Sequence, residues 1–255
     1  MRADLSLPET DLGNTLGHQW VMRANLRNRR TTEFRHVRMN IGDNRPRTLE
    51  IRTLRQINGD IAASLFCITA PFALQNINYV VCEERGATER FSIQLFLPYV
   101  SGTLREIPSS RRAEGHLGSD FSYEDLKVWL YEEDHAFEKP EERPEGIYLR
   151  GRCLRRHNLV GHGNGSLALW LDPKTAFVKG IDYFSEHNQL VREFRAEDIT
   201  NIDNVLIPAR MKLRNVSKNH STTIELVRAW YDKPIDPEVF EPAFRRKTRE
   251  YLCTL

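Results

Sequence analysis

Residues 118–126 read Gly118-Ser119-Asp120-Phe121-Ser122-Tyr123-Glu124-Asp125-Leu126 and lie between two strand-rich halves of the chain. Asp120 or Ser122 is placed to accept a hydrogen bond from the free N–H groups of a first helical turn. Ser122 and Asp125 approximate a capping box, although the acid is Asp rather than Glu or Gln. Phe121, Tyr123 and Leu126 would hold this turn against a sheet. From physics alone, the stretch is a well-capped connector.

The residues before this connector alternate between apolar and polar side chains. Residues 91–97 carry an apolar side chain at every odd position, which is the two-residue period of a half-buried strand. Residues 49–57 place Leu49, Ile51, Thr53 and Ile57 on one side, and Asn58-Gly59-Asp60 is a strong hairpin turn. We therefore predict a meander of strands over 34–41, 48–57, 61–69, 79–82, 91–97 and 103–107.

The residues after the connector repeat this pattern. We predict strands over 128–137, 148–157, 166–171, 177–185, 190–198, 206–216 and 222–231. A helical turn over 236–240 and a basic tail follow these strands. The acidic, proline-broken loop 138–146 is too short to be a domain linker. Many antiparallel strands with few helices predict a mainly β (α+β) fold built on a single curved antiparallel sheet.

The N-terminal part divides into a tail and a helix. Residues 1–10 form a loose, flexible tail with no periodic pattern, and we assign residues 11–255 to a single domain. From residue 11 onward, apolar side chains recur every four positions, which predicts a helix that can lie on the sheet. The members of this stripe are Leu12, Leu16, Trp20 and Ala24.

Composition excludes several classes of function. The formal charge of the 255 residues is +2, and the basic runs lack interleaved aromatic residues, so nucleic-acid binding is not expected. The apolar runs are strand-sized, so the chain is not expected to span a membrane. The first residues lack the apolar core of a secretion signal, which taken alone indicates the cytoplasm.

No arrangement of residues predicts catalysis, a metal site or a cofactor. There is no Gly-x-Ser-x-Gly elbow and no phosphate-binding loop. Cys153, His157 and His162 are close in sequence, but four nearby arginines oppose a cation. Cys67 and Cys82 lie on consecutive predicted strands, so they form either a disulfide across a hairpin or buried free thiols.

The connector and its surroundings resemble one known family. Residues 118–126 are similar to the GSDFTYEDL signature of the LolA-like outer-membrane lipoprotein-sorting proteins. Matching segments occur in the same order as in that family, over roughly residues 30–245. They are Phe96-Leu97-Pro98, Arg105-Glu106-Ile107, Ser109-Ser110-Arg111, Leu169-Trp170-Leu171-Asp172, Ile207-Pro208-Ala209-Arg210-Met211 and Asp236-Pro237-Glu238-Val239-Phe240. The resemblance implies an unclosed half-barrel that holds a hydrophobic ligand against a few helices.

On this basis we expect helices to cover a cavity on the concave side. Residues 12–26 and 117–127 would form a mobile lid. Its polar tether would use Arg105, Arg111, Arg112, Ser119, Asp120 and Asp125, with the arginines meeting an acidic headgroup or holding the two acids. The expected cavity lining is Phe66, Tyr79, Phe96, Tyr99, Phe121, Tyr123, Trp170, Phe184 and Trp230. Each of these aromatic residues is also suited to ordinary core packing.

The resemblance therefore implies a non-catalytic periplasmic carrier or chaperone for lipidated or other hydrophobic cargo. Its signal peptide would have been removed, and its partners would be lipoprotein acyl chains, an inner-membrane transporter or an outer-membrane acceptor. The alternative is a sensor or partner-docking domain of the same fold, associated with an envelope complex or an RND-type transporter. A hydrolase is the third possibility.

Overall fold

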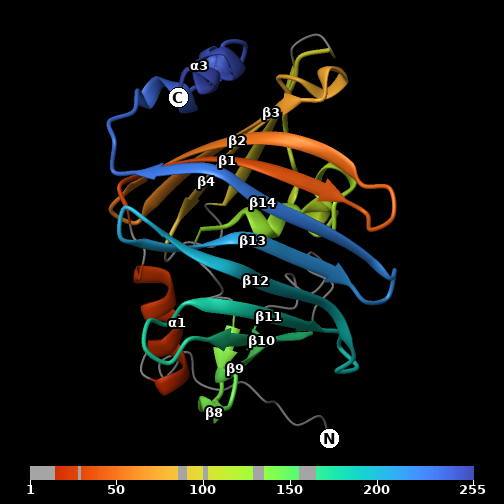
Figure 1. Ribbon diagram of the computed structural model, residues 1–255, viewed down its shortest axis with the longest axis vertical. Coiled ribbons are helices and arrows are strands. Elements are labelled where there is room, and N and C mark those ends of the chain that lie inside the picture. Colours follow the sequence, from red (N-terminus) through yellow and green to blue (C-terminus); the bar gives the residue numbers. More distant parts are fainter. Residues whose placement is uncertain (1–14, 28–29, 86–90, 100–102, 129–134, 155–164) are drawn as a thin grey trace, which may run out of the picture.

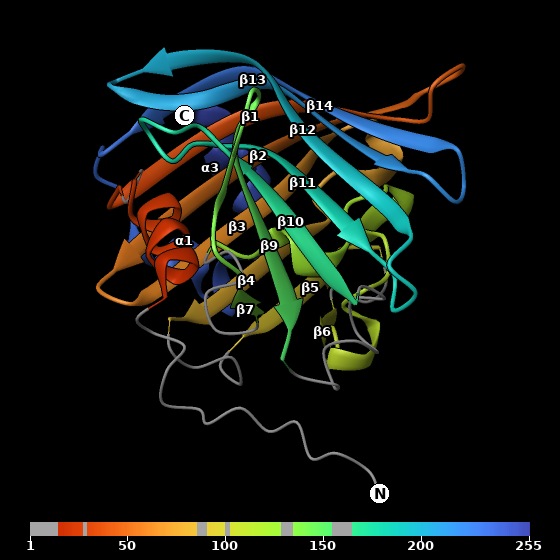
Figure 2. The same ribbon diagram turned by 90° about the horizontal axis from the view of Figure 1, so that it is seen from below.

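The computed structural model describes residues 15–27, 30–85, 91–99, 103–128, 135–154 and 165–255. Within these ranges, fourteen strands form one antiparallel sheet that curves strongly and does not close on itself (Figures 1 and 2). The mainly β fold and the unclosed half-barrel are therefore confirmed. The tail 1–10, Leu12, His157 and His162 lie outside the described residues.

The strands follow the predicted pattern closely, with β8 added beside β9. They are β1 (Thr32–Ile41), β2 (Arg47–Asn58), β3 (Ile61–Ala70), β4 (Asn78–Glu84), β5 (Ser92–Leu97), β6 (Thr103–Glu106), β7 (His135–Phe137), β8 (Glu141–Arg143), β9 (Gly146–Cys153), β10 (Ser166–Leu171), β11 (Val178–Phe184), β12 (Leu190–Ile202), β13 (Val205–Asn215) and β14 (His220–Tyr231). The helices are α1 (Leu16–Leu26) and α3 (Thr248–Thr254). The 3-10 turns are η2 (Phe72–Leu74), η4 (Ser109–Arg111), η5 (His116–Gly118), η6 (Tyr123–Leu126), η7 (Pro237–Phe240) and η8 (Pro242–Phe244).

The order of strands explains why a connector crosses the sheet. The order is β6-β5-β4-β3-β2-β1-β14-β13-β12-β11-β10-β9-β7, so β6 and β7 lie at opposite edges. The first half runs outward from β1 to one edge, and the second half returns from the other edge to pair β14 with β1. The chain between β6 and β7 must therefore pass from edge to edge, and its described part, residues 107–128, packs on the concave face. We call residues 115–127 the crossing segment.

The concave face is apolar across both halves of the sheet. Because successive strand residues point to opposite faces, the inward side chains occur at alternate positions. In the first half they form two clusters, whose buried strand members include Val37, Met39, Ile41, Leu49, Ile51, Ile68, Tyr79, Val81 and Ile93. In the second half they include Leu149, Leu167, Leu169, Leu171, Ile181, Tyr183 and Leu213. The two-residue alternation predicted from the sequence thus places the apolar residues correctly.

The convex face carries a second apolar core, which the sequence analysis did not predict. Phe34, Leu54, Leu65 and Trp230 pack there against Val239 of η7 and Leu252 of α3. The rings of Phe34 and Trp230 stack at 5.4 Å. The C-terminal residues 237–255 therefore form a cover on the outside of the sheet, rather than a free basic tail (Figure 1).

Helix α1 begins later than the stripe suggests and presents a different face. Thr15 caps it by accepting a hydrogen bond from the His18 amide at 3.2 Å. Val21 is fully buried, and Trp20 and Ala24 pack beside it against the cluster of the second half. Leu16, which the stripe predicts to be buried, is 56% exposed. The contact face is shifted because α1 lies beside β7, where Gly17 closely approaches Phe137.

The four cysteines are free thiols. Cys67 is paired with Asn78 and Cys82 with Ala63 across the β3–β4 hairpin, so the two cysteines do not face each other. Burial raises the pKa of the Cys67 thiol to about 12, as expected for an inert core residue. The alternative of free thiols therefore fits this hairpin, with Cys67 buried and Cys82 half-buried.

Candidate functional site

The crossing segment lies in the concave trough and contacts both halves of the sheet. Leu117 and Phe121 pack on the β1–β2 part of the wall. Phe121 also packs on the cluster of the second half, and the Tyr123 ring meets the Tyr79 ring edge-on at 6.0 Å. The segment is therefore an apolar filling of part of the trough, held between its two walls.

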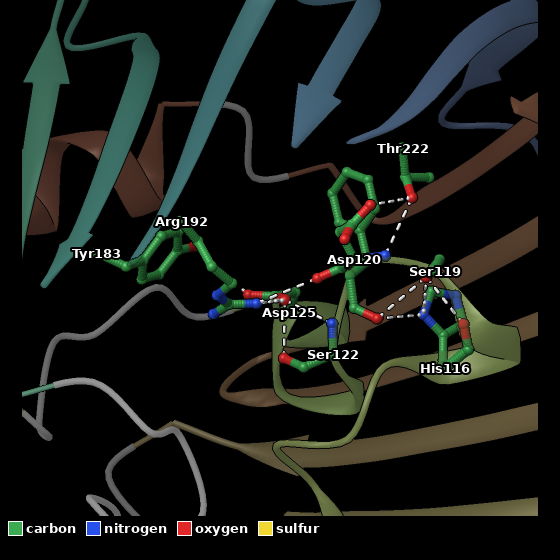
Figure 3. Close-up of polar contacts among 9 residues, drawn as sticks. His116, Ser119, Asp120, Ser122, Asp125, Tyr183, Arg192 and Thr222 are labelled. Carbon is green, nitrogen blue, oxygen red and sulfur yellow. Dashed lines mark hydrogen bonds and ion pairs between the residues drawn. The ribbon is translucent and has the colours of Figure 1, made fainter. Parts of the chain in front are cut away.

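The predicted capping box is present at the start of η6. The Ser122 side chain and the Asp125 side chain cap each other's backbone N–H groups, and the Ser122 amide donates to Asp125 Oδ2 at 2.7 Å. Arg192 on β12 pairs with the same carboxylate at 2.9 Å, and the Tyr183 hydroxyl donates to Oδ1 at 3.4 Å (Figure 3). Burial would raise the pKa of Asp125, but Arg192 and Ser122 more than offset this, and the pKa is lowered. Asp125 is therefore ionised in the trough.

The second acid of the segment is bound to β14. Thr222 donates its hydroxyl to Asp120 Oδ2 at 2.7 Å and accepts a hydrogen bond from the Asp120 amide at 3.0 Å (Figure 3). His220 Nδ1 lies 2.7 Å from the same carboxylate oxygen. Ser119 donates to the His116 carbonyl at 2.8 Å and so bonds within the segment. Two carboxylates thus attach the crossing segment to strands of the second half.

The two acids have other partners than the predicted arginines, and the role of those arginines at an acidic head group stays a prediction. Arg111 pairs with Glu114, Arg112 donates to the Phe91 carbonyl at 2.6 Å, and Arg105 is exposed on β6. Arg192, 67 residues from Asp125, takes the place that these residues were expected to fill. Nearness in sequence suggested the wrong arginines, because they lie on the β6 side of the segment whereas Asp125 faces β11 and β12.

The aromatic residues expected to line the cavity lie on both faces. Phe66, Tyr79, Phe121 and Tyr123 belong to the concave clusters. Trp230 packs under the C-terminal cover. Phe96, Trp170 and Phe184 occupy strand positions of the opposite parity to the concave residues, so they face the convex side. Tyr99 is 62% exposed and donates its hydroxyl to the Phe72 carbonyl at 3.3 Å.

A charged cluster on the concave face was missed by the sequence analysis. Glu33 Oε2 forms an ion pair with the Arg35 guanidinium at 2.9 Å, and Glu33 Oε1 forms one with the Arg55 guanidinium at 3.5 Å. All three side chains are largely buried. Burial would raise the pKa of Glu33, but the two arginines offset this and lower it. The signal was available: Arg55 interrupts the inward series Leu49, Ile51, Thr53 and Ile57.

An open groove runs beside α1. Its volume is about 610 Å³, and it is lined by Gln19, Met22, Arg23, Leu26, Arg27 and Thr175. The Arg27 guanidinium lies 4.6 Å over the Phe177 ring and donates to the Leu206 carbonyl at 3.3 Å. The groove is therefore apolar with a basic margin.

In the part of the chain that the structure describes, no group of three or more His, Cys, Asp or Glu residues is arranged to hold a metal ion. The helices within those same ranges are too short or too polar to cross a membrane.

Comparison with solved structures identifies the fold. A domain described as an outer membrane lipoprotein-sorting protein, from Vibrio parahaemolyticus, superposes with a TM-score of 0.80 at 16% identity, over 90% of this chain and 98% of its own. A DUF1329 family protein from Desulfovibrio piger gives 0.79 at 18% identity, over 88% and 95% of the two chains. A LolA superfamily protein from Nitrosomonas europaea gives 0.63 at 14% identity, over 88% and 96%.

The architecture is therefore the LolA-like fold, as the resemblance implied. Residues 61–246 match a family model described as "Uncharacterized protein"-like, and the chain belongs to that family. None of the curated proteins matches the sequence.

Proposed function

We propose that residues 11–255 act as one non-catalytic carrier domain, which binds an acyl chain or another hydrophobic group of its cargo in the concave trough. The observation that carries this proposal is an apolar wall that extends over both halves of the sheet, with a separate segment packed on it. Phe121 contacts both walls, so moving the crossing segment would uncover apolar surface on each side.

The energetics of transfer favour a covered trough. Burying an acyl chain is worth about 0.8 kcal/mol per methylene, so a sixteen-carbon chain gains roughly 12 kcal/mol before the costs of binding. A carrier must also release its cargo, and a cover held by side chains permits both states. The Asp120 side chain attaches the crossing segment to β14, and the Asp125 side chain attaches it to β12.

The proposed setting is the periplasm, with delivery to a membrane transporter or acceptor. Support comes from the fold, which is shared with a domain described as an outer membrane lipoprotein-sorting protein. At 16% identity this likeness concerns the fold, and the periplasmic role is our inference from it.

Native mass spectrometry with palmitic acid and with a synthetic lipopeptide tests the carrier proposal. We expect a one-to-one complex with each ligand. The matched control is Leu252→Ala, which alters the convex core and should leave the complex intact. Absence of any bound species with both ligands would contradict the carrier proposal.

An exposed aromatic pair favours a second candidate, a partner-docking domain of the same fold. Phe72 in η2 is 80% exposed, and Tyr99 beside it is 62% exposed. Aromatic residues are enriched at protein interfaces. This candidate predicts capture of a membrane protein in a pull-down that Phe72→Ser abolishes, together with little lipid in an extract of the purified protein.

A further inference from the structure

The charged cluster on the concave face has more cationic than anionic groups. The β1–β2 register runs without a shift, so Glu33, Arg35 and Arg55 share the inward face with Val37 and Ile51. Glu33 pairs with both arginines, and Arg55 also donates to Ser64 at 3.0 Å. One carboxylate therefore faces two guanidinium groups, each with five N–H donors.

A buried tyrosine hydroxyl faces the charged cluster. Tyr231 is paired with Glu33 across β14 and β1, and it is 5% exposed. Its hydroxyl interacts with the Arg35 guanidinium. Buried polar groups are costly unless they are satisfied, and here two guanidinium groups and a hydroxyl share one carboxylate. This excess of donors and of positive charge indicates a place for a second acceptor.

The surroundings of the cluster combine apolar and basic groups. Tyr231 packs against Val205 and Ile207, so the hydroxyl lies at the end of an apolar side chain that is itself in a hydrophobic cluster. Arg27 of the α1 groove interacts electrostatically with Tyr231. Its guanidinium donates a hydrogen bond to the carbonyl of Leu206, which lies between Val205 and Ile207 on β13. The crossing segment packs on the neighbouring cluster, which contains Met39 and Ile41 farther along β1.

We propose that Arg35, Arg55 and Tyr231 form a subsite for the anionic head group of an amphiphilic ligand, a carboxylate or a phosphate, whose chain lies on the adjacent apolar wall. Guanidinium groups bind both oxyanions through paired N–H donors. Glu33 holds the two arginines in place and limits the net charge of the empty site. This inference deepens the carrier proposal and rests on it.

The test compares two lipids that differ only in the phosphate. Binding of 1-oleoyl lysophosphatidic acid and of 1-monoolein to the full chain is measured below their aggregation concentrations, with inorganic phosphate as a third arm. We expect lysophosphatidic acid to bind about tenfold more tightly than monoolein, because a hydrogen bond to a charged group is worth about that factor. Inorganic phosphate alone should bind much more weakly than the phospholipid.

Variants assign this preference to the cluster. Arg35→Gln and Arg55→Gln should each bring the ratio of the two affinities toward one, while the affinity for monoolein changes less than about twofold. Glu33→Gln should increase the ratio, because it removes the competing carboxylate. Tyr231→Phe deletes one oxygen, so it keeps the test valid if an arginine variant fails to fold, and it should reduce the ratio about threefold. Arg210→Gln, at an exposed ion pair with Glu197, is the matched control.

Each outcome has one meaning. Equal binding of both lipids to the unaltered protein, or a preference that survives in the arginine variants, would overturn the subsite and leave the carrier proposal standing. Binding of neither lipid would contradict the carrier proposal and the subsite with it. Free phosphate that binds as tightly as the phospholipid would show a small-anion site rather than a head-group subsite.

Discussion

At the scale of single residues, the trough depends on charges that are buried with their partners. Asp125 and Arg192 are 11% and 13% exposed, whereas Arg111 and Glu114 are 60% and 51% exposed at a similar distance. A buried charge that loses its partner is strongly destabilising, while an exposed pair contributes little. Two ion pairs of similar geometry should therefore differ greatly in their effect on stability.

Asp125→Asn should reduce the free energy of unfolding by about 3 kcal/mol, because it leaves Arg192 buried without a countercharge. Urea denaturation followed by circular dichroism measures the change. Arg111→Gln is the control and should produce no measurable change. Equal losses in the two variants would contradict the structural difference between the pairs.

His116 should make the protein less stable in mild acid. Burial lowers its pKa below the ordinary 6.5, although its bond to the Phe121 carbonyl and the Asp125 charge act in the opposite direction. As the pH falls below 6.5, the unfolded chain takes up a proton that the folded chain refuses, so stability is present above this pH and decreases below it. His116→Phe should flatten the dependence of the unfolding free energy on pH between 7 and 5. An equally steep fall in this variant would contradict the assignment.

At the scale of elements, two segments cover the sheet from opposite sides. The crossing segment lies on the concave face, and residues 237–255 lie on the convex face (Figures 1 and 2). The two covers differ in their contacts. The crossing segment combines apolar contacts with ionised side chains, whereas the C-terminal cover is attached through the fully buried Val239 and Leu252. We expect the first to exchange more readily than the second.

Thr222→Val should loosen the crossing segment. It removes both hydrogen bonds between the fully buried Thr222 side chain and Asp120. Amide hydrogen exchange over residues 119–126 should accelerate about tenfold, because a bond to a charged group is worth roughly 1.5–3 kcal/mol. Thr223→Val, at the neighbouring position on the convex face, is the matched control. Unchanged exchange in the Thr222 variant would show that other contacts hold the segment.

Leu252→Ala should destabilise the protein without affecting the trough. The Leu252 side chain is fully buried in the convex core, so it contacts neither solvent nor a ligand in the trough. Its truncation should cost about 3 kcal/mol through the cavity left behind. Cys253→Ala, at the adjacent exposed position, should have little effect. Reduced lipid binding by the Leu252 variant would contradict the separation of the two faces.

At the scale of the whole molecule, the pairing of β1 with β14 joins the first half of the curved sheet to the second half, and the crossing segment packs on both. A ligand that contacts both walls would therefore stabilise the complete fold. At a free concentration one hundred times its dissociation constant, a ligand adds about 2.7 kcal/mol to the free energy of unfolding.

Lysophosphatidic acid at that concentration should raise the melting temperature by about 5 °C. Differential scanning calorimetry measures the change. Leu252→Ala should melt at a lower temperature and show the same increase, because its substitution lies outside the trough. An increase that occurs only in the unaltered protein would indicate that the ligand binds the convex core instead.

The sequence by itself determined the local features: the alternation that marks the strands, the hairpin turns and the Ser122–Asp125 capping box. These depend on residues within a few positions of one another. Only the tertiary structure decided which face is concave, that residues 237–255 cover the other face, and that Arg192 is the partner of Asp125. A two-residue period separates the two faces of a strand but does not say what covers each face. Asp125 and Arg192 are 67 residues apart, and they meet only because the chain crosses the trough on its way from one edge of the sheet to the other.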